Sequence, residues 1–197
     1  MIIHKHRKIL ASSILGLWLF VIAGSFWWFE LRWLRPFLDQ VALFNGEQLT
    51  RAYGTQLAGA RNSNDTQTAI TVMHFADGDC PCNRFNLPHV QEIQRHYQQQ
   101  GVKFISWQQG AEPVQLDGFS INHQTTQLAH VPATPAVAIW SASGDLAYFG
   151  PYSSGLLCSL GDGFAETILD QLPAGHSPQV INTTGVGCFC PTTQKSV

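Results

Sequence analysis

Residues 69–85 read AITVMHFADGDCPCNRF, and this stretch decides the fold. It opens with Ala69 to Phe75, an apolar run rich in β-branched side chains that is typical of a buried strand. A helix is expected from Asn83 to Gln100, because apolar residues recur there at helical spacing and Gly101 can end it. Val102 to Trp107 predicts a second buried strand. Together these segments predict a β-α-β unit with parallel strands and a right-handed crossover.

The residues that follow predict the rest of an α/β fold. Ala136 to Trp140 and Asp145 to Phe149 flank a Ser-Ala-Ser-Gly turn, which favours an antiparallel hairpin. Asp162 can cap a helix that runs to Leu172. We interpret Asn122 to His130 as a further short helix. A central sheet with helices on both faces satisfies this order of elements.

The Cys80-Pro81-Cys82 motif lies between the first strand and the first helix. Proline suits the first turn of a helix, because the N–H that it lacks would be unpaired there. Cys80 is then expected near the N-cap, where the helix dipole stabilises a thiolate. A thiolate attacks disulfides, so we predict Cys80 as the nucleophile and Cys82 as its resolving partner. Asp77 and Asp79 oppose this, because nearby negative charge disfavours a thiolate.

A disulfide between Cys80 and Cys82 would close a very small ring. A tight turn can bring the two Cα atoms close enough, but it does not provide unstrained torsions. Strained disulfides are reduced more easily than relaxed ones. We therefore expect a Cys80–Cys82 pair to act as an oxidant or an isomerase-type couple rather than as a strong reductant.

The order of these elements resembles the thioredoxin superfamily over residues 66–173, and is closest to membrane-tethered bacterial thioredoxin-like proteins and the redoxin branch. The resemblance implies a thioredoxin-like fold, with a central mixed sheet and flanking helices. It also makes Pro135 the family's cis-proline and Thr134 the residue whose backbone faces a bound thiol partner. The family has C-x-x-C where this chain has C-x-C, although Pro81-Cys82 preserves the usual last step.

The resemblance implies a thiol-disulfide oxidoreductase that needs no cofactor and acts on cysteine-containing exported proteins or on a redox partner. A second hypothesis is a copper(I)-handling protein, because copper-delivery relatives have the same fold. In that case His74, His89, His123 or His130 could add a ligand, but none stands at a diagnostic offset, so we assign no metal ligand. A third hypothesis is a non-catalytic interaction module.

Three further cysteines follow in the chain, which has five in all. Cys188 and Cys190 lie in a segment, residues 174–197, that we expect to be a flexible tail. They form a candidate second redox pair that exchanges with Cys80 and Cys82, a clip for Cu(I) or Zn, or a structural disulfide. A link to Cys158 is the remaining alternative, since sequence does not set connectivity. Cys158 itself lies in an apolar patch and is expected to be a small core residue.

The N-terminal region predicts a membrane anchor. Residues 9–29 contain no charged side chain and are long enough to cross a hydrocarbon core of about 30 Å. Lys5, Arg7 and Lys8 precede them, so the positive-inside rule predicts a cytoplasmic N-terminus. We expect a single-pass protein of the bacterial inner membrane with its main domain in the periplasm. A signal peptide cleaved near Ala23 is the alternative, and it exports the same domain.

The sequence thus divides into four parts: a basic stub and anchor (residues 1–36), a partly helical connector (37–65), the thioredoxin-like domain (66–173) and the C-terminal segment (174–197). The helical pattern of the connector is weak and is interrupted at Asn45-Gly46 and at Gly54. Residues 37–197 carry a net charge of −6, with acidic residues outnumbering basic ones. A nucleic-acid binder needs a basic face, so we exclude that class.

Overall fold

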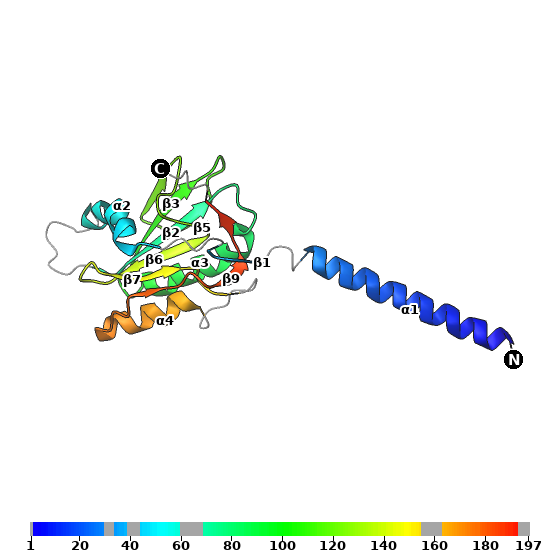
Figure 1. The fold of residues 1–197 in the computed structure, drawn as a ribbon. Coiled ribbons are helices and arrows are strands. Elements are labelled where there is room, and N and C mark those ends of the chain that lie inside the picture. Colours follow the sequence, from blue (N-terminus) through cyan, green and yellow to red (C-terminus); the bar gives the residue numbers. More distant parts are fainter. Residues whose placement is uncertain (1, 30–33, 39–43, 60–68, 155–162, 193–197) are drawn as a thin grey trace. The chain divides into compact units, whose positions relative to one another are not determined.

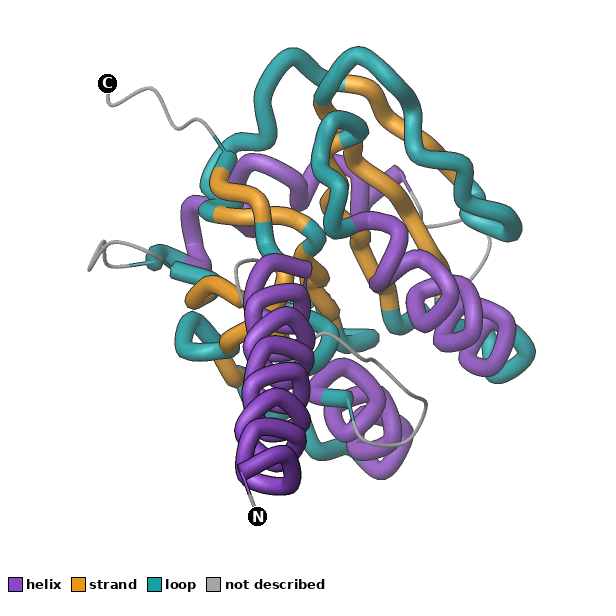
Figure 2. The backbone as a smooth tube through the Cα atoms, turned by 90° about the vertical axis from the view of Figure 1, so that its right-hand side faces the viewer, coloured by secondary structure: helices purple, strands orange, loops and turns teal. Residues whose placement is uncertain are grey.

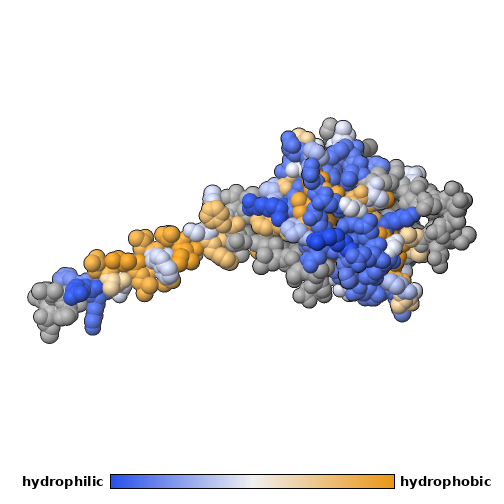
Figure 3. All heavy atoms as spheres, turned by 180° about the vertical axis from the view of Figure 1, so that it is seen from behind, coloured by the Kyte–Doolittle hydropathy of each residue, from blue (hydrophilic) through white to orange (hydrophobic). Residues whose placement is uncertain are grey.

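The structure is a computed structural model that describes residues 2–29, 34–38, 44–59, 69–154 and 163–192. The chain divides into two units, Met1–Leu34 and Arg35–Val197 (Figure 1). The first unit contains α1 (Ile2–Phe29). Within it, an 18-residue window of His6–Phe29 has a mean hydropathy of 2.1, so this helix is long and apolar enough to cross a membrane. Its side chains are exposed and form a largely orange surface in Figure 3.

The helix thus confirms the predicted apolar span in length and composition. A signal sequence can have the same length and apolar composition, so the orientation and the compartment remain predictions.

A six-stranded mixed sheet forms the centre of the second unit, in the order β4-β3-β2-β6-β7-β8. Its strands are β2 (Thr71–Asp77), β3 (Lys103–Gln109), β4 (Ile121–Gln124), β6 (Ala136–Trp140), β7 (Leu146–Gly150) and β8 (Val180–Ile181). β2 runs parallel to β3 and antiparallel to β6, and β6 pairs with β7 as a hairpin. With a helix between β2 and β3, this is the thioredoxin-like fold, and it confirms the predicted β-α-β unit and hairpin.

Helices cover both faces of the sheet (Figure 2). On one face lie α3 (Asn83–Gln98) and α4 (Phe164–Gln171), which is followed by a short 3-10 turn (Leu172–Ala174). On the other face lies α2 (Gly46–Gly59). Successive residues of β2 point to opposite faces, so Val72 joins the core under α3 and α4, while Met73 joins the core under α2. Burial on both sides explains the continuous apolar run of this strand.

Two expected helices differ from the observed elements. The connector helix begins only at Gly46, because the Asn45 side chain accepts hydrogen bonds from the backbone N–H groups of Glu47 (3.0 Å) and Gln48 (3.2 Å). Asn45-Gly46 is therefore a helix start and not an interruption. The break expected at Gly54 is also wrong, because α2 continues through this residue to Gly59. The helix expected within Asn122–His130 is wrong: its first residues belong to strand β4, which pairs with β3. The predicted cap Asp162 lies outside the described residues.

The C-terminal segment is not the flexible tail that we expected. Up to Thr192 it contains β8, β9 (Val186–Cys188) and β10 (Cys190–Pro191). β8 extends the main sheet beside β7, β9 pairs with β1 (Leu34–Pro36), and β10 pairs with β5 (Ala133–Thr134). Between β9 and β10, Phe189 is buried against Phe37, with ring centroids 5.2 Å apart. Strands this short leave no periodic pattern in a sequence, so the prediction failed here.

We predict that Phe189→Ala lowers the free energy of unfolding by about 3–5 kcal/mol, the usual cost of removing a buried phenylalanine. Val186→Ala is the matched control, because Val186 lies on the same segment and is 48% exposed. It should change stability by no more than about 0.5 kcal/mol. Urea unfolding of the full chain in detergent measures both. A loss at Phe189 as small as the loss at Val186 would contradict the packing of this segment.

A cluster of buried polar side chains lies between the sheet, α3 and α4. The Nδ1 atom of His74 lies 2.9 Å from the Tyr152 hydroxyl, and His89 contacts Glu166 at 2.5 Å. His74 is only 1% exposed, and burial lowers its pKa from 6.5 to about 3. The folded protein therefore keeps this imidazole neutral at pH values where the unfolded chain protonates it.

The free energy of unfolding should fall as the pH drops from about 6.5 towards about 3, because only the unfolded chain takes up this proton. His74→Gln keeps a polar side chain beside Tyr152 but removes the titration, so its stability should depend less on pH in this window. Urea unfolding at a series of pH values measures the two slopes. Equal slopes for the two proteins would show that His74 does not contribute.

Candidate active site

The turn between β2 and α3 is held against the segment that follows β3. The backbone N–H of Gly78 donates to the Gln109 carbonyl at 2.8 Å. A Cβ atom on Gly78 would lie 1.6 Å from the Glu112 carbonyl oxygen, so only glycine fits this close approach. At the end of the turn, the N–H of Cys80 donates to the Asp77 carbonyl at 3.0 Å. These contacts fix where Cys80 lies at the end of β2.

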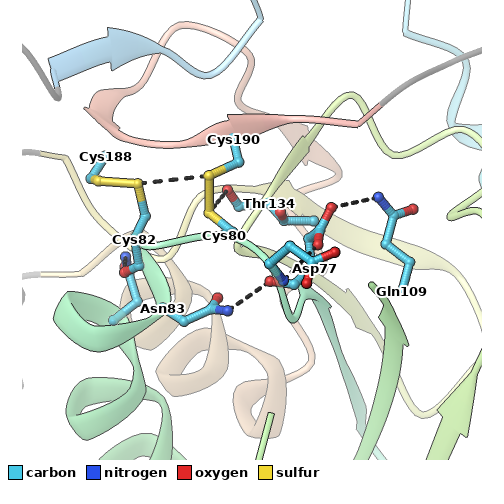
Figure 4. The surroundings of a disulfide bond; sticks show 10 residues. Asp77, Cys80, Cys82, Asn83, Gln109, Thr134, Cys188 and Cys190 are labelled. Atoms are coloured by element: carbon cyan, nitrogen blue, oxygen red, sulfur yellow. Dashed lines mark hydrogen bonds between the residues drawn. A yellow bond between two sulfur atoms is a disulfide. The ribbon is translucent and has the colours of Figure 1, made fainter. Parts of the chain in front are cut away.

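The two acidic side chains before Cys80 accept hydrogen bonds from nearby N–H groups. One carboxylate oxygen of Asp77 accepts from the Asp79 N–H at 2.9 Å, and the other accepts from the Gln109 side-chain amide at 2.7 Å (Figure 4). The Asp79 carboxylate accepts from the Ala111 N–H at 3.3 Å. Donors on the β3 side thus compensate part of the negative charge that the sequence placed beside Cys80.

Cys80 and Cys82 lie at the N-terminus of α3, as the sequence predicted. Cys82 is the N-cap residue, and the Asn83 N–H donates to the Cys80 carbonyl at 3.2 Å. The Asn83 side chain also donates to the Asp77 carbonyl at 2.7 Å, which ties the turn to the helix. Both sulfurs are therefore attached at the positive end of the helix dipole, where a thiolate is stabilised.

The disulfides connect this motif to the C-terminal segment. Cys80 bonds to Cys190 with an S–S distance of 2.07 Å, and Cys82 bonds to Cys188 with an S–S distance of 2.02 Å. The expected Cys80–Cys82 pair is therefore wrong for this structure, as is a local Cys188–Cys190 pair. The two bonds lie side by side, because the Cys82 and Cys190 sulfurs are only 4.0 Å apart (Figure 4). Cys158 lies outside the described residues.

The cis-proline loop lies beside the Cys80–Cys190 bond. The Thr134-Pro135 peptide is cis, and the Cys80 sulfur lies 3.9 Å from the Thr134 carbonyl oxygen. An oxidised sulfur has no proton to donate, so this is a packing contact. In the antiparallel β5–β10 pair, Cys190 stands opposite Thr134. The Thr134 backbone, which we expected to face a thiol partner, thus faces a cysteine of the same chain.

The two disulfides differ in how far solvent reaches them. Cys82 and Cys188 are 1% and 2% exposed, so their bond is closed to an external thiol. Cys80 is 5% exposed, but its partner Cys190 is half-buried. Pro81 and Pro191 are exposed beside it. The Cys80–Cys190 bond is therefore the one that a partner's thiol can reach.

The structure brings some of the candidate residues together and leaves others apart. Cys80, Cys82, Thr134, Cys188 and Cys190 come together, with Pro135 next to Thr134. The histidines have other contacts, as the sequence suggested for two of them: His74 is buried in a strand and His89 in a helix. His123 stacks on Trp107, with ring centroids 4.3 Å apart, and His130 is exposed. The sequence left the cross-links open, although the equal C-x-C spacing of both cysteine pairs was a signal that they could pair with each other.

We predict that double variants reveal this connectivity, in a chain that also carries Cys158→Ser. After Cys82→Ser and Cys188→Ser, Cys80 and Cys190 should still form a disulfide, because the structure bonds them. After Cys82→Ser and Cys190→Ser, the remaining Cys80 and Cys188 should stay free thiols. Trypsin separates the two cysteine regions at Arg84 and Lys103, so mass spectrometry of unreduced digests detects the link. A link in the second variant and none in the first would overturn the pairing.

The chain can be compared with known proteins. A family model described as "Domain of unknown function (DUF6436)" matches residues 47–192, and no curated protein matches. The structure is similar to an uncharacterized conserved protein from Geobacillus kaustophilus, with 16% identity, a TM-score of 0.50 and coverage of 66% of this chain and 80% of that one.

Two more distant structures have names that describe disulfide chemistry. One is a thiol:disulfide interchange protein from Chlorobium tepidum (16% identity, TM-score 0.38, 53% of this chain and 79% of that one). The other is a secreted disulfide oxidoreductase from Mycobacterium tuberculosis (13% identity, TM-score 0.36, 54% and 81%). Because the family model matches most of the chain, the protein belongs to the family described as a domain of unknown function, DUF6436, and has a thioredoxin-like fold.

Proposed function

We propose that the protein is a membrane-tethered, extracytoplasmic thiol-disulfide oxidoreductase in which Cys80 is the nucleophile. One observation carries the proposal: Cys80 lies at the N-terminus of α3 and is bonded to the half-buried Cys190 beside the cis-proline loop. An ionised, reachable sulfur at this position is the group that disulfide exchange requires.

In the reduced form, the Cys80 thiolate attacks a disulfide of the substrate. A mixed disulfide forms on Cys80, and one substrate sulfur leaves as a thiolate. The Cys190 thiolate then attacks the Cys80 sulfur, restores the Cys80–Cys190 bond and releases the second substrate thiol. Two electrons have passed from the protein to the substrate. The same path in reverse oxidises a substrate dithiol, and the partner's potential sets the direction.

The structure supports Cys190 as the resolving thiol, because it is bonded to Cys80. The sequence suggested Cys82, whose sulfur also lies within 4.8 Å of both Cys80 and Cys190. In this mechanism the buried Cys82–Cys188 bond fastens the C-terminal segment, so that Cys190 stays within reach of Cys80. The two candidates therefore predict different trapped intermediates.

The proposed location follows from the cysteines and the N-terminal helix. Disulfides persist in oxidising compartments such as the periplasm, and α1 can hold the domain at the inner membrane with the basic N-terminus in the cytoplasm. The partners are then cysteine-containing exported proteins, or a redox protein that returns the Cys80–Cys190 pair to its starting oxidation state.

We predict that Cys80→Ser reduces turnover of a disulfide-bridged peptide to the rate of the reductant alone. The assay uses the full chain in detergent. Cys190→Ser should instead accumulate a mixed disulfide between Cys80 and the peptide, because the resolving thiol is missing. Cys158→Ser is the control and should keep the parent rate.

Mass spectrometry of acid-quenched samples identifies the trapped species. Full turnover by Cys80→Ser would refute the proposed function. If the mixed disulfide accumulates in Cys82→Ser and not in Cys190→Ser, the resolving thiol is Cys82.

A further inference from the structure

The cysteine cluster contains more sulfur atoms than the two that take part in the proposed disulfide exchange. The sulfurs of Cys80, Cys82 and Cys190 all lie within 4.8 Å of one another. The Cys188 sulfur is attached to that of Cys82 by the second disulfide, at 2.02 Å. Figure 4 shows the two bonds side by side between the start of α3 and the C-terminal segment. Three sulfur atoms thus lie within a common distance of 4.8 Å, and the fourth, that of Cys188, is bonded to one of them.

Contacts other than the disulfides hold these residues together. β10 pairs with β5, and the N–H of Thr192 donates to the Pro132 carbonyl at 2.9 Å. The Thr192 hydroxyl also donates to the Val131 carbonyl. Phe189, which lies between Cys188 and Cys190 in the sequence, is buried against Phe37. The Phe37 N–H donates to the Gly185 carbonyl at 2.8 Å. These contacts do not involve the disulfides, so we expect them to support the same placement of the cysteines after reduction.

Reduction converts the cluster into a set of metal ligands. One external dithiol reduces the reachable Cys80–Cys190 bond. The freed Cys190 thiolate, whose sulfur lies 4.0 Å from that of Cys82, then attacks Cys82 and releases Cys188 as a thiolate, and a second dithiol reduces the new Cys82–Cys190 bond. The two dithiols become disulfides, deliver four electrons and four protons, and leave four thiols on the protein. A metal ion that binds these sulfurs displaces their protons into solvent. In the oxidised form these sulfurs are held in disulfides, offer no thiolate and cannot bind in this way.

We propose that the reduced cluster of Cys80, Cys82 and Cys190 binds one thiophilic metal ion of the Cu(I) or Zn(II) class. Thiolate ligands select these ions, and the group found among the described residues consists of sulfur donors alone. Tetrahedral Zn–S bonds of about 2.3 Å place sulfurs about 3.8 Å apart. The unbonded Cys82 and Cys190 sulfurs already lie 4.0 Å apart. This binding does not depend on the proposed function, since it requires no turnover.

The test uses the full chain in detergent, reduced and then freed of reductant under anaerobic conditions. Cu(I) is added in competition with bicinchoninate, and Zn(II) in competition with 4-(2-pyridylazo)resorcinol. The reduced protein should retain one equivalent of at least one of the two ions, and the oxidised protein should retain none. Which ion is retained identifies the metal. X-ray absorption at that metal's edge should show a shell of sulfur neighbours at about 2.3 Å.

Cys82→Ser and Cys190→Ser should each weaken retention by at least about tenfold, because each removes a ligand. Cys158→Ser is the matched control for unspecific thiol binding and should retain the ion as the parent does. Retention of neither ion by the reduced chain overturns the proposal, as does equal retention by the oxidised chain or loss in Cys158→Ser alone. These results are independent of the peptide-turnover assay, so either proposal can fail without the other.

Discussion

The whole arrangement depends on the antiparallel pairing of β10 with β5. This pair sets Cys190 opposite Thr134, and the Thr134 carbonyl lies 3.9 Å from the Cys80 sulfur. The pairing thus brings the last described part of the chain to the N-terminus of α3, more than a hundred residues away in sequence. Without it, Cys80 and Cys82 would lose Cys190 and Cys188 as partners, and a bond between the two would close the small and strained ring that C-x-C spacing allows.

The two disulfides that this pairing brings together differ in burial. The Cys82–Cys188 bond is buried and closes the C-terminal segment onto the domain, whereas the Cys80–Cys190 bond has one half-buried end. Disulfide exchange at Cys80 and metal binding by the reduced cluster would use the same sulfurs. A bound metal ion would therefore block exchange, and oxidation would expel the ion. The redox state of the domain would decide which of the two chemistries is available.

The sequence predicted those parts of the structure that have a strong periodic signal. The continuous apolar runs of β2 and β3, the helix α3 and the β6–β7 hairpin all lie where expected, because tertiary packing agrees with local propensity there. The cis peptide at Pro135 was expected from the family resemblance and is present.

The misses share one physical cause, which is dependence on distant partners. β4 is a short polar strand that exists because β3 offers it an edge. β10 has only two residues, and its position follows from Phe189 packing into the core and from the pairing with β5. The disulfide connectivity depends on that position, so local patterns could not reveal it. The equal spacing of the two C-x-C motifs is compatible with two cross-links side by side, but it does not show that they form.

The position of the sulfur atoms themselves tests this account most directly. A crystal of the oxidised protein, measured at a long X-ray wavelength, gives an anomalous difference map in which each sulfur appears as a peak. The account predicts two neighbouring pairs of peaks, one joining Cys80 to Cys190 and one joining Cys82 to Cys188. Peaks that join Cys80 to Cys82, with Cys188 and Cys190 elsewhere, would contradict it.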